Sequence, residues 1–185
     1  MLEELGLSPT GEVEEVPDSP VGCAALPTGW FLVFVNRGTL AFSDEPLPAL
    51  SAGCKVVFCA VEEHVMSSLA ACYVDGQVAW QVAHDSEKGT YHLDSRGDLP
   101  AEFDEIFHAA KHEQDLAGGE KADVDCIHDV PIDLAKAITG FRHDEKTPGL
   151  DAEPFKVLEH VSATASNRSS ADPSRPSVRP WWRFW

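Results

Sequence analysis

Four charged or titratable side chains stand in a row after a predicted helix: Arg142, His143, Asp144 and Glu145. A histidine beside a carboxylate is a common arrangement for proton transfer, so this stretch is a candidate acid–base group. A basic residue just past a helix C-terminus is also favoured by the helix dipole, without any reactivity. Because no nucleophile stands nearby in the sequence, we interpret the stretch as the end of a helix cap. The residues that follow the cap are expected to face solvent or a partner.

A second group of acidic and imidazole side chains lies near the ends of predicted strands. Its members are Glu62, Glu63, His64, His84, Asp85 and His92. A hairpin between these strands would bring His64 and His84 together, and carboxylates with several histidines suit a divalent metal or general acid–base work. Polar residues also belong at strand ends for solvation alone, and this is the commoner explanation.

A third group, Glu105, His108 and His112, has spacings of three and four residues, which place the three side chains on one side of a helix. Metal-binding helices use such spacings, but the H-E-x-x-H pattern of zinc hydrolases is absent. Motifs of the G-x-S-x-G, S-x-x-K and Walker A types are absent too. We therefore expect an exposed helix face here, no catalytic residue, no metal and no cofactor.

The elements that must position these groups predict an α+β fold. Apolar, β-branched runs at 30–37 and 54–65, two runs on either side of Asp75-Gly76, and a run at 90–95 indicate strands. Asp-Gly between such runs favours a tight type I′ hairpin. We expect about five strands, connected in sequence into one antiparallel sheet.

Two helices are predicted after residue 98, and they are expected to cover one face of the sheet. The first shows apolar residues at i, i+3, i+4 and i+7 from Phe103. The second begins near Asp129 and ends at Gly140, where a left-handed C-cap is expected, with Phe141 packing back onto its last turn. An extended piece over 124–128 is expected between them.

Two shorter elements are also predicted, and the chain as a whole divides into three regions. Ser43 or Asp44 is expected to cap a short helix that Gly53 ends, and the run 154–161 fits a strand or a helix. The regions are an acidic arm at 1–28 with one short strand over 11–16, a single α+β domain at 29–161, and a tail at 162–185. The tail is rich in Ser, Pro and Arg and ends in an aromatic cluster with Trp181, Trp182 and Trp185.

The charge is unusually acidic and unevenly placed. The chain carries 31 Asp and Glu against 14 Lys and Arg, a net charge of −17. The tail holds four arginines and one aspartate, so the preceding 161 residues carry −20. Such a body repels nucleic acid and anionic membrane and attracts basic proteins. Solubility alone is the alternative explanation of this acidity.

The cysteines and the N-terminus favour a cytoplasmic location. The five cysteines are odd in number and include no C-x-x-C pair, which argues against a disulfide framework or a zinc knuckle. The acidic N-terminus lacks the apolar core of a signal peptide, and no apolar run approaches the length of a membrane span.

The size, the acidity and the lack of catalytic motifs resemble those of small bacterial cytoplasmic proteins that neutralise toxic effectors. This resemblance implies a protein-binding module, such as an immunity-type inhibitor of a basic effector. Its candidate contacts are Glu62, Glu63, His64, His84, Asp85, Arg142, His143, Asp144, Trp181, Trp182 and Trp185. The alternatives are a metal-dependent or acid–base enzyme built on Glu62, Glu63, His64, His84 and Asp85, and an assembly component tethered through the aromatic tail.

Overall fold

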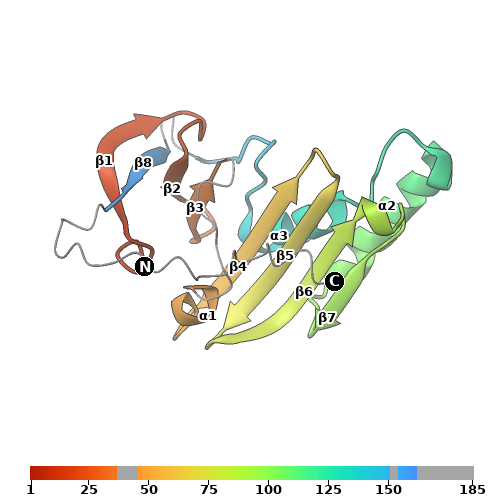
Figure 1. Cartoon of the computed structure of the whole chain (residues 1–185), viewed down its shortest axis with the longest axis horizontal. Helices are drawn as coiled ribbons and strands as arrows, with labels where there is room; N and C mark the ends of the chain where they lie inside the picture. Colours follow the sequence, from red (N-terminus) through yellow and green to blue (C-terminus); the bar gives the residue numbers. More distant parts are fainter. Residues whose placement is uncertain (37–45, 151–153, 162–185) are drawn as a thin grey trace, which may run out of the picture.

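The computed structural model describes residues 1–36, 46–150 and 154–161. Within these ranges the chain forms two antiparallel sheets of four strands each and three α-helices, which confirms the α+β class (Figure 1). The expectation of one sheet with about five strands is imprecise, because strands from the two ends of the described chain build a separate sheet. Ser43, Asp44 and the 162–185 tail, with Trp181, Trp182 and Trp185, lie outside the described residues.

The first sheet joins the beginning and the end of the described chain. Across the sheet its strands are β1 (Leu7–Glu14), β8 (Phe155–His160), β2 (Val21–Ala25) and β3 (Phe31–Val35). The run at 154–161 is therefore a strand, and it lies between two N-terminal strands. The region expected to be an arm contributes both β1 and β2, where a single strand was expected, while its boundary at residue 28 stays a prediction.

The second sheet is a meander in sequence order. Its strands are β4 (Lys55–Glu62), β5 (Ser67–Val74), β6 (Gln77–Asp85) and β7 (Asp94–Gly97). The predicted hairpin at Asp75-Gly76 is confirmed, since both turn residues have positive φ, 47° and 80°. The strand expected over 90–95 is wrong over 90–93, because β7 begins at Asp94. Residues 90 and 91 form a turn, and just after it the His92 ring accepts the Asp85 backbone N–H at 3.1 Å.

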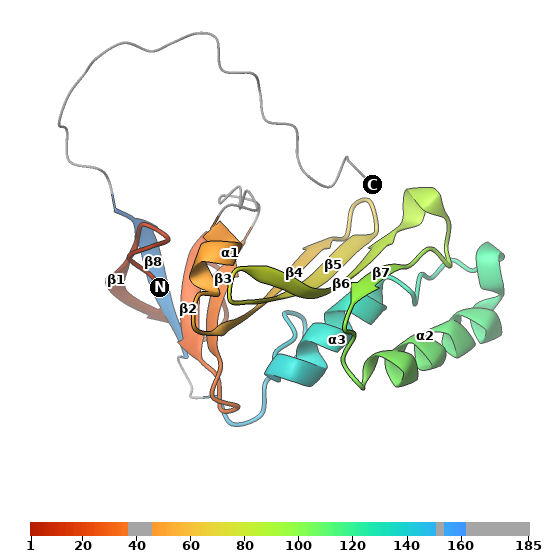
Figure 2. The same ribbon diagram turned by 90° about the horizontal axis from the view of Figure 1, so that it is seen from below.

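The two predicted helices, α2 (Phe103–Ala117) and α3 (Asp129–Thr139), cover one face of the second sheet. Their apolar sides meet the side chains that β5 and β6 point toward them, in a core that includes Cys72, Trp80 and Val82. The short helix α1 (Pro46–Leu50) lies on the opposite face, near one end of the strands (Figure 2). Two 3₁₀ turns, η1 (Ser86–Lys88) and η2 (Gly119–Lys121), complete the described elements.

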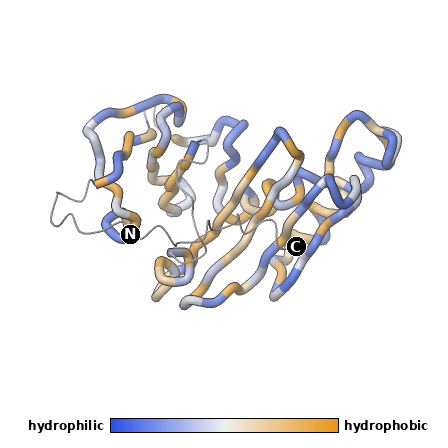
Figure 3. The backbone as a smooth tube through the Cα atoms, in the orientation of Figure 1, coloured by the Kyte–Doolittle hydropathy of each residue, from blue (hydrophilic) through white to orange (hydrophobic). Residues whose placement is uncertain are grey.

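Hydropathy follows this arrangement. Figure 3 shows long hydrophobic stretches in β4 and β5 and a hydrophilic segment at the end of α2 and in η2. Within the described ranges, no helix has both the length and the apolar character needed to cross a membrane.

An aromatic contact joins the first sheet to the chain just after α3. Gly140 has φ of 80° and ends the helix with the expected left-handed cap. A Cβ at this position would lie 2.6 Å from the Thr28 side chain, so glycine is required for the close approach as well. Phe141 was expected to pack back onto the last turn of α3. Its ring packs edge-on against Phe34 of β3 and Phe155 of β8, with centroids 6.3 and 6.4 Å away.

A buried glutamine organises the connection between α2 and α3. Gln114 is fully buried, and its side-chain amide donates to the carbonyl oxygens of Gly119 and Val124 at 2.9 and 3.0 Å. Its side-chain oxygen accepts the backbone N–H of Cys126 at 2.7 Å. The piece expected to be extended over 124–128 is instead a turn region held by this amide, because backbone groups withdrawn from water need such partners.

Replacing this glutamine tests its role. Gln114→Met keeps the side-chain length but leaves two carbonyl groups and one N–H without a partner, so we expect the free energy of unfolding to fall by about 2–4 kcal/mol. Urea denaturation followed by circular dichroism measures the change. Glu113→Gln, at the exposed neighbouring position, is the control and should shift stability by less than about 0.5 kcal/mol. Equal stability of Gln114→Met and the native chain would contradict the account.

Candidate functional site

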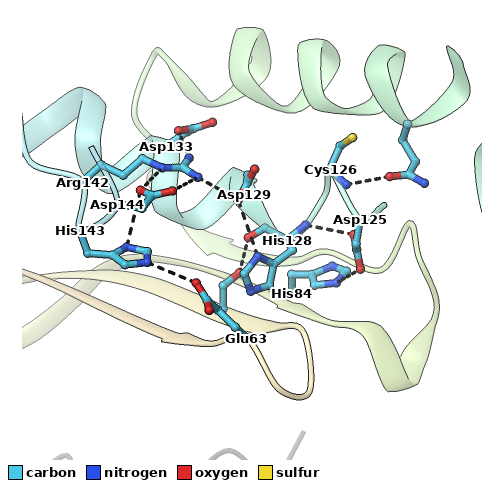
Figure 4. Close-up of polar contacts among 12 residues, drawn as sticks. Glu63, His84, Asp125, Cys126, His128, Asp129, Asp133, Arg142, His143 and Asp144 are labelled. Atoms are coloured by element: carbon cyan, nitrogen blue, oxygen red, sulfur yellow. Dashed lines mark hydrogen bonds and ion pairs between the residues drawn. The ribbon is translucent and has the colours of Figure 1, made fainter. Parts of the chain in front are cut away.

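Arg142 is the centre of a network of carboxylates at one side of α3 (Figure 4). Its guanidinium donates to Asp144 at 2.7 Å, to Asp133 at 2.6 Å and to Asp129 at 3.2 Å. The arginine side chain is only 12% exposed, so its charge is matched almost entirely by these neighbours. The chain after α3 therefore turns back along the helix and is held there by one guanidinium, whose fork geometry suits several oxygens at once.

The network keeps its acidic members ionised. Hydrogen bonding to Asp144, and then to Asp133, raises the pKa of Arg142. The pKa of Asp129 is lowered, first by the His128 ring, whose Nδ1 lies 3.7 Å from it, and then by the Arg142 charge. The Arg142 hydrogen bond lowers the pKa of Asp144 as well. These carboxylates are fixed negative charges near neutral pH, which suits charge recognition better than proton donation.

Two of the groups noted in the sequence meet at this network. The His143 ring lies 3.8 Å from the Glu63 carboxylate, and 4.0 Å from Asp144. Glu63 comes from the turn between β4 and β5, on a different element from the Arg142 stretch (Figure 4). Its neighbours Glu62 and His64 are 62% and 94% exposed in the side chain and contact each other at 3.4 Å.

The resulting surface is termed the acidic junction. It consists of the five carboxylates Glu63, Asp129, Asp133, Asp144 and Glu145. Their side chains are 40–74% exposed, in contrast to the arginine among them. Besides Arg142, the one lysine or arginine that contacts them among the described residues is Lys136, at 2.7 Å from Glu145. The junction thus presents an excess of negative charge to solvent. The hydrogen bonds of the largely buried Arg142 hold three of its carboxylates in place.

His84 and Asp85 are not part of this surface in the described chain. Successive residues of a strand point to opposite faces, and His84 points to the helix side of the second sheet, where its side chain is fully buried. Asp85 accepts the Glu87 backbone N–H at 3.1 Å and lies 3.9 Å from Lys88. The hairpin brings Ser68 opposite His84, whereas His64 lies in the turn beyond the end of β4.

Both ring nitrogens of His84 are engaged. Nδ1 lies 2.7 Å from the His92 carbonyl oxygen, and Nε2 lies 3.0 Å from Asp125 Oδ2. A carbonyl oxygen only accepts, so Nδ1 carries a hydrogen, and the second contact needs one more proton shared between ring and carboxylate. The other Asp125 oxygen accepts the His128 backbone N–H at 3.2 Å. This pair is a buried tether between β6 and the start of α3.

No sequence pattern indicated that Asp125, His128 and Ser68 lie beside His84. Asp125 is 41 residues away, and spacing rules do not reach that far. The His128 ring stands edge-on to His84, with centroids 6.1 Å apart, and its buried Nε2 has no hydrogen-bond partner in the described chain. Ser68 donates its hydroxyl hydrogen to the His128 carbonyl oxygen at 2.6 Å, so it binds backbone rather than acting as a nucleophile.

The remaining candidates show no reactive arrangement. The pKa of the Cys126 thiol is raised by burial and by the charges of Glu113, Asp129 and Asp125, which disfavours the nucleophilic thiolate. Glu105, His108 and His112 lie exposed on α2, as expected. Among the described residues, no three His, Cys, Asp or Glu side chains are arranged to hold a metal ion. All five cysteines are free.

A cavity of about 330 Å³ lies elsewhere, on the first sheet. It is lined by Cys23, Ala24, Ala25, Leu26, Pro27, Phe31, Gly149, Leu150, Pro154 and Lys156. No lining residue belongs to the acidic junction or to the His84–Asp125 pair, so this cavity does not connect the candidate residues.

Comparison of the chain with protein-family models, with curated proteins and with solved structures finds no match. The function is therefore inferred from the chain's own residues.

The His84–Asp125 tether predicts a difference between two substitutions. Asp125→Ala leaves His84 Nε2 and the His128 N–H without a partner, so we expect the free energy of unfolding to fall by about 2–4 kcal/mol. Asp125→Asn retains an oxygen for the N–H and an amide that can donate to neutral His84, and should cost less than half as much. Urea denaturation of both variants measures this, and equal losses would contradict the tether.

The Arg142 network predicts a defined dependence of stability on pH. The pKa values of Asp129 and Asp144 are lower in the folded chain than their ordinary value near 4. Their contribution is therefore fully present above about pH 5 and is lost as the pH falls through the folded values. Arg142→Met should lower stability at pH 7 by about 1–2 kcal/mol, since water screens the half-exposed carboxylates, and should flatten the loss below pH 4.

Urea denaturation at pH 7, 4 and 3 measures this dependence. Lys136→Met is the control, because it removes a more exposed cation that contacts Glu145 alone. The prediction fails if Arg142→Met and the native chain lose stability in parallel on acidification.

Proposed function

We propose that the chain is a small partner-binding protein, and that the acidic junction binds a basic protein. The observation that carries the proposal is the contrast at Arg142. The arginine is 12% exposed, whereas the carboxylates around it are 40–74% exposed. Side chains already held in one geometry lose less conformational freedom on binding, which favours recognition of a cationic surface.

The charge of the whole chain supports the same proposal. The net charge of −17 gives a field that attracts basic molecules and raises their association rate. Charge complementarity of this kind contributes more to the rate and the specificity of association than to affinity. An immunity-type inhibitor of a basic toxic effector, acting in a bacterial cytoplasm, is the finer form of this proposal.

The enzyme alternative has less support in the geometry. It needs Glu62, Glu63, His64, His84 and Asp85 to converge at a hollow that admits a substrate. Instead His64 is 94% exposed, and the His84 side chain is fully buried with both nitrogens engaged. The exposed carboxylates spread over an open surface, which is the arrangement expected of a binding protein.

A charge-neutral variant of the junction tests the proposal. In the triple variant Glu63→Gln, Asp133→Asn and Glu145→Gln, three charges are lost while side-chain size is kept. Capture of partners from the native host, followed by mass spectrometry, should recover a basic protein with the native chain and little of it with the variant. The association rate of that protein should fall by about 5–10-fold in the variant and by more than tenfold for the native chain between 50 and 500 mM salt.

The matched control removes three charges from the exposed side of α2, through Asp104→Asn, Glu105→Gln and Glu113→Gln. This control has the same net charge as the junction variant, so it should retain the partner and most of the association rate. Equal loss in both variants would mean that overall charge, rather than the acidic junction, attracts the partner. An acidic partner, or a rate insensitive to salt, would contradict the proposal altogether.

A further inference from the structure

The second sheet has an outer face that α2 and α3 do not touch, and Figure 1 looks onto it. The helix α1 packs against one end of this face, at Ala71 and Tyr73. Further along β5, Leu69 stands on the same face between Ala60 of β4 and Ala83 of β6. Leu69 is 8% exposed, with Phe58 of β4 diagonally beside it on the same face. Among the described residues, the apolar cluster beneath α1 does not include Leu69, Ala60 or Ala83.

We propose that the C-terminal aromatic segment of the same chain, residues 181–185, docks on this outer face beside α1. Twenty-four residues follow Val161, and four of the last five are aromatic. The 19 residues at 162–180 precede the aromatic segment. A random-coil connection of this length has an end-to-end distance on the order of 24 Å, and its fully extended reach is roughly 60 Å.

The chemistry of the face fits this occupant. Ala60 and Ala83 leave shallow space over β4 and β6, and flat aromatic rings fill such space with a large buried area. Glu62 and Asp94 stand at the margins of the same face, with side chains 62% and 60% exposed. They give the arginine between the aromatic residues a place of opposite charge.

The net charges of the two parts also favour docking within one chain. The tail carries +3 and the remainder of the chain −20. Attraction between them is intramolecular, so the tail is present at an effective concentration in the millimolar range without any partner. This inference is independent of the acidic junction, which lies at the opposite side of the sheet with α3.

Four full-length or truncated proteins test the docking. They are the native chain, the chain ending at Pro180, and each of these with Ala83→Glu, which puts a charge on the outer face. Truncation should lower Tm by about 4–8 °C, and Ala83→Glu in the full chain should lower it by a similar amount. In the truncated chain Ala83→Glu should cost less than about 2 °C, because the face is then open to water. Such non-additivity is the signature of direct contact.

A synthetic peptide of residues 176–185 provides the reverse experiment. Added to the truncated protein, it should restore Tm and shift backbone amide resonances of β4, β5 and β6. The same peptide with all three tryptophans replaced by alanine keeps its charge and should do neither. Additive effects of truncation and Ala83→Glu, or resonance shifts confined to another surface, would overturn the proposal.

Light scattering tests whether the segment docks on a second copy of the chain, and fluorescence quenching tests the docking without truncation. Light scattering should show the same monomeric mass for the native and truncated chains, and a native dimer that truncation dissociates would place the segment on a second copy instead. If the truncated chain does not fold, acrylamide quenching of tryptophan fluorescence in the full chain decides the matter. Quenching should increase with Ala83→Glu and stay unchanged with Ala109→Glu on the exposed side of α2. Equal quenching in both variants would refute the docking.

Discussion

The contact between His84 Nε2 and the Asp125 carboxylate is the constraint on which the arrangement of the second sheet and its helices depends. A buried imidazole and a buried carboxylate are costly unless each finds its partner, so the turn before α3 must lie against β6. Gln114 makes this possible, since it fixes the backbone on both sides of Asp125. Ser68 adds a bond from β5 to the same turn. The position of α3 is thus set by directional contacts as well as by its apolar side.

Arg142 uses the same chemistry at the surface with a different outcome. Its partners Asp129 and Asp133 belong to α3, whose position is set by the buried contacts. Its third partner, Asp144, lies in the chain that follows α3. The side chains of these three aspartates remain 40–48% exposed. Buried polar groups therefore stabilise one arrangement of the fold, while the half-exposed carboxylates keep contact with solvent. The His84 and His128 side chains, in contrast, are closed off from solvent.

Features that depend on interactions between residues near in sequence were predicted, whereas features that depend on residues far apart in sequence were not. The hairpin at Asp75-Gly76 and the cap at Gly140 were predictable because positive φ is a local property of those residues. The helices α2 and α3 were predictable from apolar periodicity. The first sheet was not, because β8 bonds to β1 across 147 residues, as in the contact from Thr10 to Val157. Apolar content identifies a strand without identifying its neighbour.

The sequence alone determined the acidity of the chain, the residue types of the candidate groups, and most of the elements that carry them. Tertiary structure decided which groups meet. Glu63 and His143 became neighbours because α3 packs beside the β4–β5 hairpin, a contact between elements that no spacing rule describes. His84 and Asp85, adjacent in sequence, were separated because a strand directs alternate side chains to opposite faces, and only packing shows which face is closed. Composition fixes the charges available, and long-range packing fixes where each one points.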